Sequence, residues 1–311
     1  MLPDPEALTD FRPTARLAAN ARPAPPWRDE LRRIPNTRNA FGVILLYAQT
    51  IGIVVAAVWF DNWFVWALAF VLMGRAHAQF AALMHEAAHR LLFRSRRIND
   101  WVGRWLLGFP SFTPIDLYRR GHMAHHRDEF GPDEPDIPLY RGYPITRASF
   151  RRKLTRDAEG RTGFKLFKGL LRAVRAEGPA GEQARRIVAV QIVLIAIGIA
   201  LHHPWVYFIL WLAPYLTVWR VINRLRSIAE HGGMQRSKDR RLTTHSVRQT
   251  FPARFMLVPF HIGWHLAHHV DSGVPMANLP KLHAELRRSG YVNGTIEYPS
   301  YHALWAKLSS G

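Results

Sequence analysis

The histidines of this chain gather into four short patterns. The motif HExxH occupies residues 85–89, the spacing HxxHH occurs at 122–126 and again at 265–269, and the sequence AEHGG occupies residues 229–233. On a helix, residues i and i+4 differ by about 40° in azimuth, and residues i and i+3 also share a face. Each pattern therefore aims its imidazoles at one region, which is the arrangement that metal ligation needs.

The number of imidazoles limits the kind of metal site. These patterns hold nine of the 16 histidines. A catalytic zinc takes three protein ligands, so a single zinc cannot use nine. Two metal ions can, and imidazole is a good ligand for iron. We expect no catalytic residue beyond the metal ligands, and the predicted ligands are His85, His89, His122, His125, His126, His231, His265, His268 and His269.

Five further polar residues are candidates for supporting roles. Glu86 is predicted to accept an imidazole N–H and so fix the tautomer of a ligand, although in a zinc peptidase it would be the general base. Asn223 can reach a metal through water. His77 lies in an apolar segment, where ionisable groups are usually functional; it either lines a substrate channel, supports a ligand or packs as a polar side chain. Asp133 and Asp136 are either partners of the imidazoles or formers of a turn.

Four apolar runs must position these groups. They cover residues 40–60, 63–84, 187–201 and 204–222. A helix that crosses about 30 Å of hydrocarbon needs about 20 such residues. Because only short turns separate the runs within each pair, the sequence predicts an all-α fold with four transmembrane helices in two hairpins.

The basic residues indicate which side of the membrane each segment occupies. The chain has 42 Lys and Arg residues and 23 Asp and Glu residues. No Lys or Arg falls in the short turns at 61–62 and 202–204. By the positive-inside rule, both termini and the middle loop are cytosolic. We therefore expect an irregular cytosolic lead over residues 1–38 and a membrane domain over 39–311. In this domain a helical cytosolic cap, formed by 85–186 and 223–311, holds all four histidine patterns.

The net charge of +19 bears on the partners of the chain. In a soluble protein such a surplus would suggest nucleic acid. Here the basic residues flank apolar runs, which favours anionic membrane lipids or an acidic partner protein instead. Residues 163–177 have the pattern of a basic amphipathic helix that lies on a membrane surface. The absence of cysteine excludes disulfides and thiolate-held clusters.

The combination of patterns resembles the membrane fatty acid desaturase family, whose three histidine boxes read HxxxH, HxxHH and HxxHH. The similarity runs through most of residues 40–285. It includes DEPD at 133–136 and VPMANLPKLH at 274–283. The sequence NRLRSIAEHGG at 223–233 resembles the segment that carries an additional iron-binding histidine. Among bacterial members, the chain is similar to the rhizobitoxine-type subgroup.

This resemblance implies a di-iron centre, O2 as co-substrate and introduction of a double bond into a fatty acyl or similar aliphatic chain. It also implies a multi-pass protein of the bacterial inner membrane with a cytosolic metal site. Electrons would come from a separate ferredoxin, cytochrome b5 or reductase. The substrate would be carried by a lipid, an acyl carrier protein or coenzyme A.

Two alternatives stay open from the sequence. A hydroxylase of the same superfamily would carry the same boxes. An intramembrane zinc metalloprotease would also place HExxH on a membrane helix, but it should have a downstream aspartate in an LDG-like context, and the sequence contains no LDG.

Overall fold

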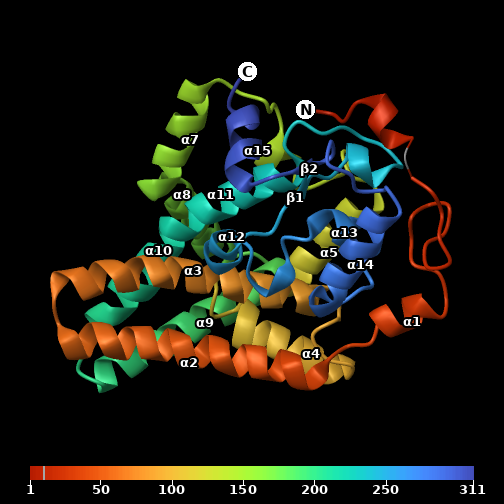
Figure 1. Cartoon of the computed structure of the whole chain (residues 1–311). Coiled ribbons are helices and arrows are strands. Elements are labelled where there is room, and N and C mark those ends of the chain that lie inside the picture. Colours follow the sequence, from red (N-terminus) through yellow and green to blue (C-terminus); the bar gives the residue numbers. More distant parts are fainter. Residues whose placement is uncertain (10) are drawn as a thin grey trace.

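The chain folds as an assembly of helices (Figure 1). The computed structural model describes residues 1–9 and 11–311. Within this described part the only strands are β1 (Ser246–Val247) and β2 (Glu297–Tyr298), which pair in parallel. The expected helical fold class is confirmed.

The three longest helices are also the most apolar. They are α2 (Asn36–Phe60), α3 (Trp63–Ala88) and α9 (Gly178–Ala200), and α2 and α3 lie side by side as an antiparallel pair. Three segments, 27–60, 63–88 and 178–200, are long and apolar enough to cross a membrane. Large apolar side chains such as Trp59 and Trp63 are exposed on them, which suits a lipid environment and not water.

The hairpin between α2 and α3 closes through two polar residues. Asp61 adopts a left-handed conformation that ends α2, and the Asn62 side chain accepts a hydrogen bond from the Val65 N–H at 3.0 Å. Asn62 thus satisfies one of the amide groups that a helix start leaves unpaired.

The apolar run at 204–222 forms a broken helix instead of one straight spanning helix. It consists of a π-helical turn η3 (Tyr207–Leu212), α10 (Ala213–Leu216) and the start of α11 (Val218–His231). Thr217 has non-helical angles, φ −119° and ψ −84°. Pro214 has no N–H to donate, so the regular hydrogen-bond ladder cannot continue through it. The break lets α11 leave the direction of α10.

The remaining elements surround one end of the α2–α3 hairpin. Helix α8 coincides with most of the expected basic amphipathic helix at 163–177. The bounds of these elements are α4 (Arg96–Trp101), η2 (Val102–Gly108), α5 (Ile115–Arg127), α6 (Ile137–Tyr140), α7 (Arg147–Ala158) and α8 (Arg161–Ala173).

The C-terminal part of the cap consists of short helices. They are η4 (Arg240–Leu242), α12 (Phe251–Met256), η5 (Pro259–His261), α13 (His265–Val270), η6 (Met276–Asn278), α14 (Leu279–Arg288) and α15 (Tyr301–Leu308). The N-terminal segment, with η1 (Pro5–Leu8) and α1 (Trp27–Leu31), runs along the cap (Figure 1). Arg32 anchors it through an ion pair of 2.7 Å with Asp271.

Gly74 allows α11 to contact α3. A Cβ atom at position 74 would lie 2.3 Å from Val218 Cγ1, a distance at which the two helices must separate. Because α11 carries His231 into the cap, this contact helps to set the position of the histidine site relative to the membrane helices.

We predict that Gly74→Ala lowers the free energy of unfolding by about 1–3 kcal/mol, the usual effect of overpacking a tight core. Unfolding by SDS in mixed micelles measures it. Gly52→Ala is the matched control, since a Cβ atom at position 52 in α2 meets nothing within 4 Å. Equal stability of the two variants would contradict this account.

Candidate metal centre

Four segments that are distant in sequence bring the nine predicted histidines together. The end of α3 supplies His85, and His89 follows directly after this helix. Helix α5 supplies three histidines from 122–126, the last residue of α11 is His231, and α13 supplies three more from 265–269. The expected convergence of the four patterns is therefore present in the structure.

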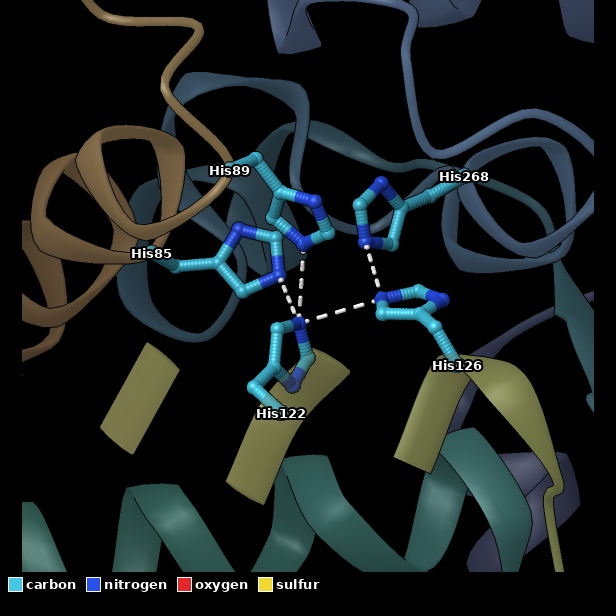
Figure 2. Close-up of side chains that lie close together, drawn as sticks. All are labelled: His85, His89, His122, His126 and His268. Carbon is cyan, nitrogen blue, oxygen red and sulfur yellow. Dashed lines mark hydrogen bonds between the residues drawn. The ribbon is translucent and has the colours of Figure 1, made fainter. Parts of the chain in front are cut away.

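Five of these imidazoles form a first cluster (Figure 2). Its members are His85, His89, His122, His126 and His268. The Nε2 atom of His122 lies 2.9 Å from those of His85 and His89, and 3.1 Å from that of His126. The Nε2 atom of His268 lies 3.0 Å from that of His126.

The other four imidazoles form a second cluster. His125, His231 and His269 hold ligand nitrogens within 4.8 Å of one another. The Nε2 atom of His265 lies 3.0 Å from the Nε2 atoms of both His231 and His269. The three histidines of each HxxHH motif are thus divided between the two clusters.

The separations between nitrogens fit shared cations better than hydrogen bonds. A neutral imidazole Nε2 has either one proton or one lone pair, so that of His122 cannot serve three neighbours at once. Three contacts of 2.9–3.1 Å at the one Nε2 atom of His122 are therefore better explained by a shared cation than by hydrogen bonds alone.

Two buried glutamates orient imidazoles of the second cluster. His125 Nδ1 lies 2.5 Å from Glu134 Oε1, and His269 Nδ1 lies 2.5 Å from Glu129 Oε1. A carboxylate at Nδ1 fixes the proton there, so the lone pair of Nε2 faces the centre of the cluster. Glu134 is itself held by the Tyr140 hydroxyl.

The other two imidazoles of the second cluster are held in a similar way. His231 Nδ1 donates to the carbonyl oxygen of Thr243 at 2.8 Å. His265 Nδ1 lies 3.6 Å from Glu230 Oε1, and the same oxygen accepts from Arg226 Nε at 2.6 Å. Three of the four imidazoles of this cluster therefore have a hydrogen-bond acceptor at Nδ1, whereas His265 Nδ1 faces Glu230 without a hydrogen bond.

Burial keeps most of these imidazoles neutral. It lowers the pKa of His89 to about 3. Burial, followed by repulsion between neighbouring imidazoles, lowers the pKa well below the ordinary value of 6.5 for His122, His126, His231, His265, His268 and His269. For His125 burial lowers the pKa, but the hydrogen bond and charge of Glu134 outweigh it, and the net direction is upward. Neutral imidazole is the form that binds a metal.

A cavity of about 590 Å³ adjoins the histidines. His122, His125, His231 and His265 line it, so it reaches both clusters. Much of its wall is apolar, with Phe112, Leu117, Leu166, Leu170 and Trp219 among the lining residues. Such a cavity accommodates an aliphatic chain next to the metal ligands.

Some of the supporting residues predicted from the sequence line the cavity, and others lie away from it. Asn223 and Asp136 line the cavity, and burial raises the pKa of Asp136. Asp133 is exposed. His77 lies outside both clusters: its Nε2 is 3.0 Å from the carbonyl oxygen of Trp211, and it packs on that ring at 4.3 Å.

Glu86 has a partner other than the expected imidazole. Its Oε1 accepts the backbone N–H of Met276 at 2.9 Å, which ties the end of α3 to η6. No imidazole is among its hydrogen bonds in residues 1–9 and 11–311. His85 and His89 also share a cluster with His122, so the HExxH motif is one part of a larger site. A zinc peptidase would instead use these two histidines as ligands of a single zinc, with Glu86 as the general base.

Sequence reasoning missed the glutamates that hold the imidazoles. Glu134 stands between Asp133 and Asp136, and Glu129 follows the first HxxHH motif by three residues. The available signal was the acidic segment as a whole, because five carboxylates follow the motif within ten residues: Asp128, Glu129, Asp133, Glu134 and Asp136. Which of them turns inward depends on the fold of the loop.

The fold and the site together define a class of protein: a helical protein with three helices apolar enough to cross a membrane and clusters of histidines that could hold metal ions. Comparison with known sequences agrees with this class. The profile of the fatty acid desaturase family matches residues 61–301. The chain therefore belongs to the fatty acid desaturase family and is a desaturase-like oxidoreductase.

Characterised relatives include a dihydrorhizobitoxine desaturase from Bradyrhizobium elkanii, 25% identical over 71% of this chain and 67% of the relative. An sn-1 oleoyl-lipid 12-desaturase from Anabaena variabilis is 20% identical over 82% of this chain and 78% of its own length. An sn-1 acyl-lipid omega-3 desaturase (ferredoxin) from Synechocystis is 22% identical over 82% and 75%.

We predict that Glu134→Gln weakens metal binding by the second cluster about 10–100-fold, because the fixed orientation and basicity of His125 are lost. Competition with a chelator of known affinity measures the change. Asp133→Asn, one residue away and exposed, is the matched control and should leave affinity unchanged. A Glu134→Gln protein with wild-type affinity would show that this contact does not support a ligand.

Proposed function

We propose that this protein is a di-iron desaturase of a membrane, which uses O2 and external electrons to introduce a double bond into a fatty acyl or similar aliphatic chain. The observation that carries the proposal is the convergence of nine neutral or oriented imidazoles beside a largely apolar cavity. Imidazole suits iron, and nine imidazoles exceed the three protein ligands that a catalytic zinc takes.

The two clusters of histidines would be two sets of metal ligands. His85, His89, His122, His126 and His268 would hold one ion, and His125, His231, His265 and His269 the other. A bound iron pair would supply the redox chemistry with O2 that removes hydrogen from unactivated C–H bonds. Asn223 lines the cavity and is the candidate for a contact through water.

The chain itself positions the substrate and controls access of water. Phe112, Leu117 and Trp219 give the cavity apolar walls, which hold an aliphatic chain and exclude water from the reacting carbons. Glu134 and Glu129 keep the protons of two imidazoles on Nδ1, away from the centre. The names of the three relatives all describe desaturation, which favours a double bond over hydroxylation as the product.

The same comparisons support a proposal for the substrate and the electron donor. Two of the relatives are named for acyl lipids, and one name specifies ferredoxin. We therefore propose an acyl lipid or another aliphatic compound as substrate, with acyl carrier protein and coenzyme A as other carriers. A ferredoxin, cytochrome b5 or reductase would be the donor. Exposed arginines near the histidine-bearing helices would attract an acidic donor: Arg90, Arg94, Arg96, Arg97, Arg120 and Arg127.

The proposed membrane arrangement has four passes. Helices α2, α3 and α9 are three of them, and the broken segment from η3 to the start of α11 is the fourth. The lead at 1–38, the cap and the metal centre would be cytosolic, in a bacterial inner membrane. The distribution of Lys and Arg supports this orientation.

This topology predicts which positions react with a membrane-impermeant maleimide in intact cells. The chain has no cysteine, so a maleimide can label only the single cysteine that is introduced. We expect labelling of Asn62→Cys and His203→Cys from outside, while Ser310→Cys reacts only after the cells are opened. Labelling of all three from one side would reject the four-pass arrangement.

The proposed function predicts about two metal ions per chain and an alkene product that depends on them. Purified protein, loaded with ferrous iron and supplied with ferredoxin, its reductase and O2, is incubated with membrane lipids. Mass spectrometry then separates a product that has lost two hydrogens from one that has gained oxygen. His125→Ala with His268→Ala removes one ligand from each cluster and should abolish both metal binding and product.

His302→Ala is the matched control, since His302 is exposed on α15. It should keep wild-type metal content and activity. One metal per chain that persists in the double variant would overturn the proposal, and an oxygenated product would turn it into a hydroxylase.

A further inference from the structure

Arg220 is a cation in the wall of the substrate cavity without a carboxylate partner. Its Nε donates to the carbonyl oxygen of Tyr215 at 3.0 Å. Its guanidinium lies 4.1 Å from the ring centroid of Tyr215 and 5.9 Å from that of Trp219. These partners are uncharged, and within residues 1–9 and 11–311 Arg220 forms no ion pair.

The neighbouring arginines of α11 differ from Arg220 in this respect. Arg224 pairs with Asp157 through two hydrogen bonds, and Arg226 pairs with Glu230 at 2.6 Å. The acids near this part of the helix are therefore already engaged. An arginine without a counter-ion at the depth of the membrane helices is costly and usually functional. Val218, two residues before Arg220, contacts α3 at Gly74.

A purely structural role would explain only part of this arrangement. The Tyr215 carbonyl lies just before the break at Thr217, and Arg220 satisfies it. That hydrogen bond uses Nε. The two terminal nitrogens of a guanidinium are the pair that binds carboxylate or phosphate oxygens in bidentate fashion.

We propose that Arg220 binds an anionic group of the substrate, so that the cavity takes an aliphatic chain that bears a carboxylate or a phosphate. This inference rests on the proposed function and names its substrate class. His231 stands eleven positions after Arg220 on α11, which is about 16 Å along the helix axis. Carbon–carbon bonds of about 1.5 Å advance an extended chain by about 1.3 Å each, so roughly twelve bonds would connect the anion to the reacting carbon.

The test compares dodecanoate with dodecan-1-ol, which share chain length and differ in charge. Radiolabelled ligand is bound to metal-loaded protein in phosphatidylcholine nanodiscs, with protein-free discs as the blank. Wild-type protein should bind dodecanoate at least about tenfold more tightly than the alcohol, the scale of a charge-assisted hydrogen-bond pair. Arg220→Gln should remove this preference, and Arg220→Lys should retain part of it.

Arg172→Gln on α8 is the matched control. Arg172 is exposed, and it is absent from the lining of the cavity, so the variant should keep the preference. If wild-type protein shows no preference, or if Arg220→Gln weakens both ligands equally, Arg220 has only a structural role and the proposal is wrong.

Two further measurements separate related questions. Dodecyl phosphate, compared with dodecanoate, distinguishes a phosphate headgroup from a free acid as the natural source of the anion. Metal content of the same preparations reports on the di-iron proposal independently. A protein with two metals but no preference for the anion would overturn the role of Arg220 and leave the proposed function standing.

Discussion

The structure depends on one constraint: nine imidazoles must be packed with their Nε2 atoms facing inward. Neighbouring Nε2 atoms approach to 2.9–3.1 Å, where protonated rings would repel. Burial keeps most of the rings neutral, and acceptors at Nδ1 hold the proton on the outer side in the second cluster. The glutamates and the Thr243 carbonyl therefore support the orientation of the histidines.

This constraint explains the path of the chain around the site. The end of α3 offers two imidazoles at the boundary of the membrane helices, and α5, α11 and α13 must all reach that point. The break at Thr217 allows α11 to leave the direction of α10, cross α3 at Gly74 and end at His231. A straight helix over the same residues would continue along the direction of the membrane hairpin.

Helix α11 also connects the second histidine cluster to the cavity beside it. Three of its arginines have different surroundings: Arg224 and Arg226 are paired with carboxylates, and Arg220 faces the cavity beside two aromatic rings. The helix therefore contributes structural ion pairs, a cavity wall and a metal-facing histidine on successive turns. The contact with α3, the cavity wall and the second histidine cluster are linked through this one element.

The sequence by itself determined the nine histidines, their helical spacing, the helical fold class and the family, because these depend on local periodicity and composition. Of the four apolar runs that it predicted as spans, three lie in long apolar helices and the fourth is broken. The tertiary structure decided how the histidines divide. Each HxxHH motif contributes to both clusters, with His125 apart from His122 and His126, since the partners come from other helices. It also places Glu134, and not Asp133, at the Nδ1 atom of His125, and it pairs Glu86 with the backbone N–H of Met276. The helix is broken at Thr217. Those outcomes depend on contacts between residues far apart in the chain, which no local pattern records.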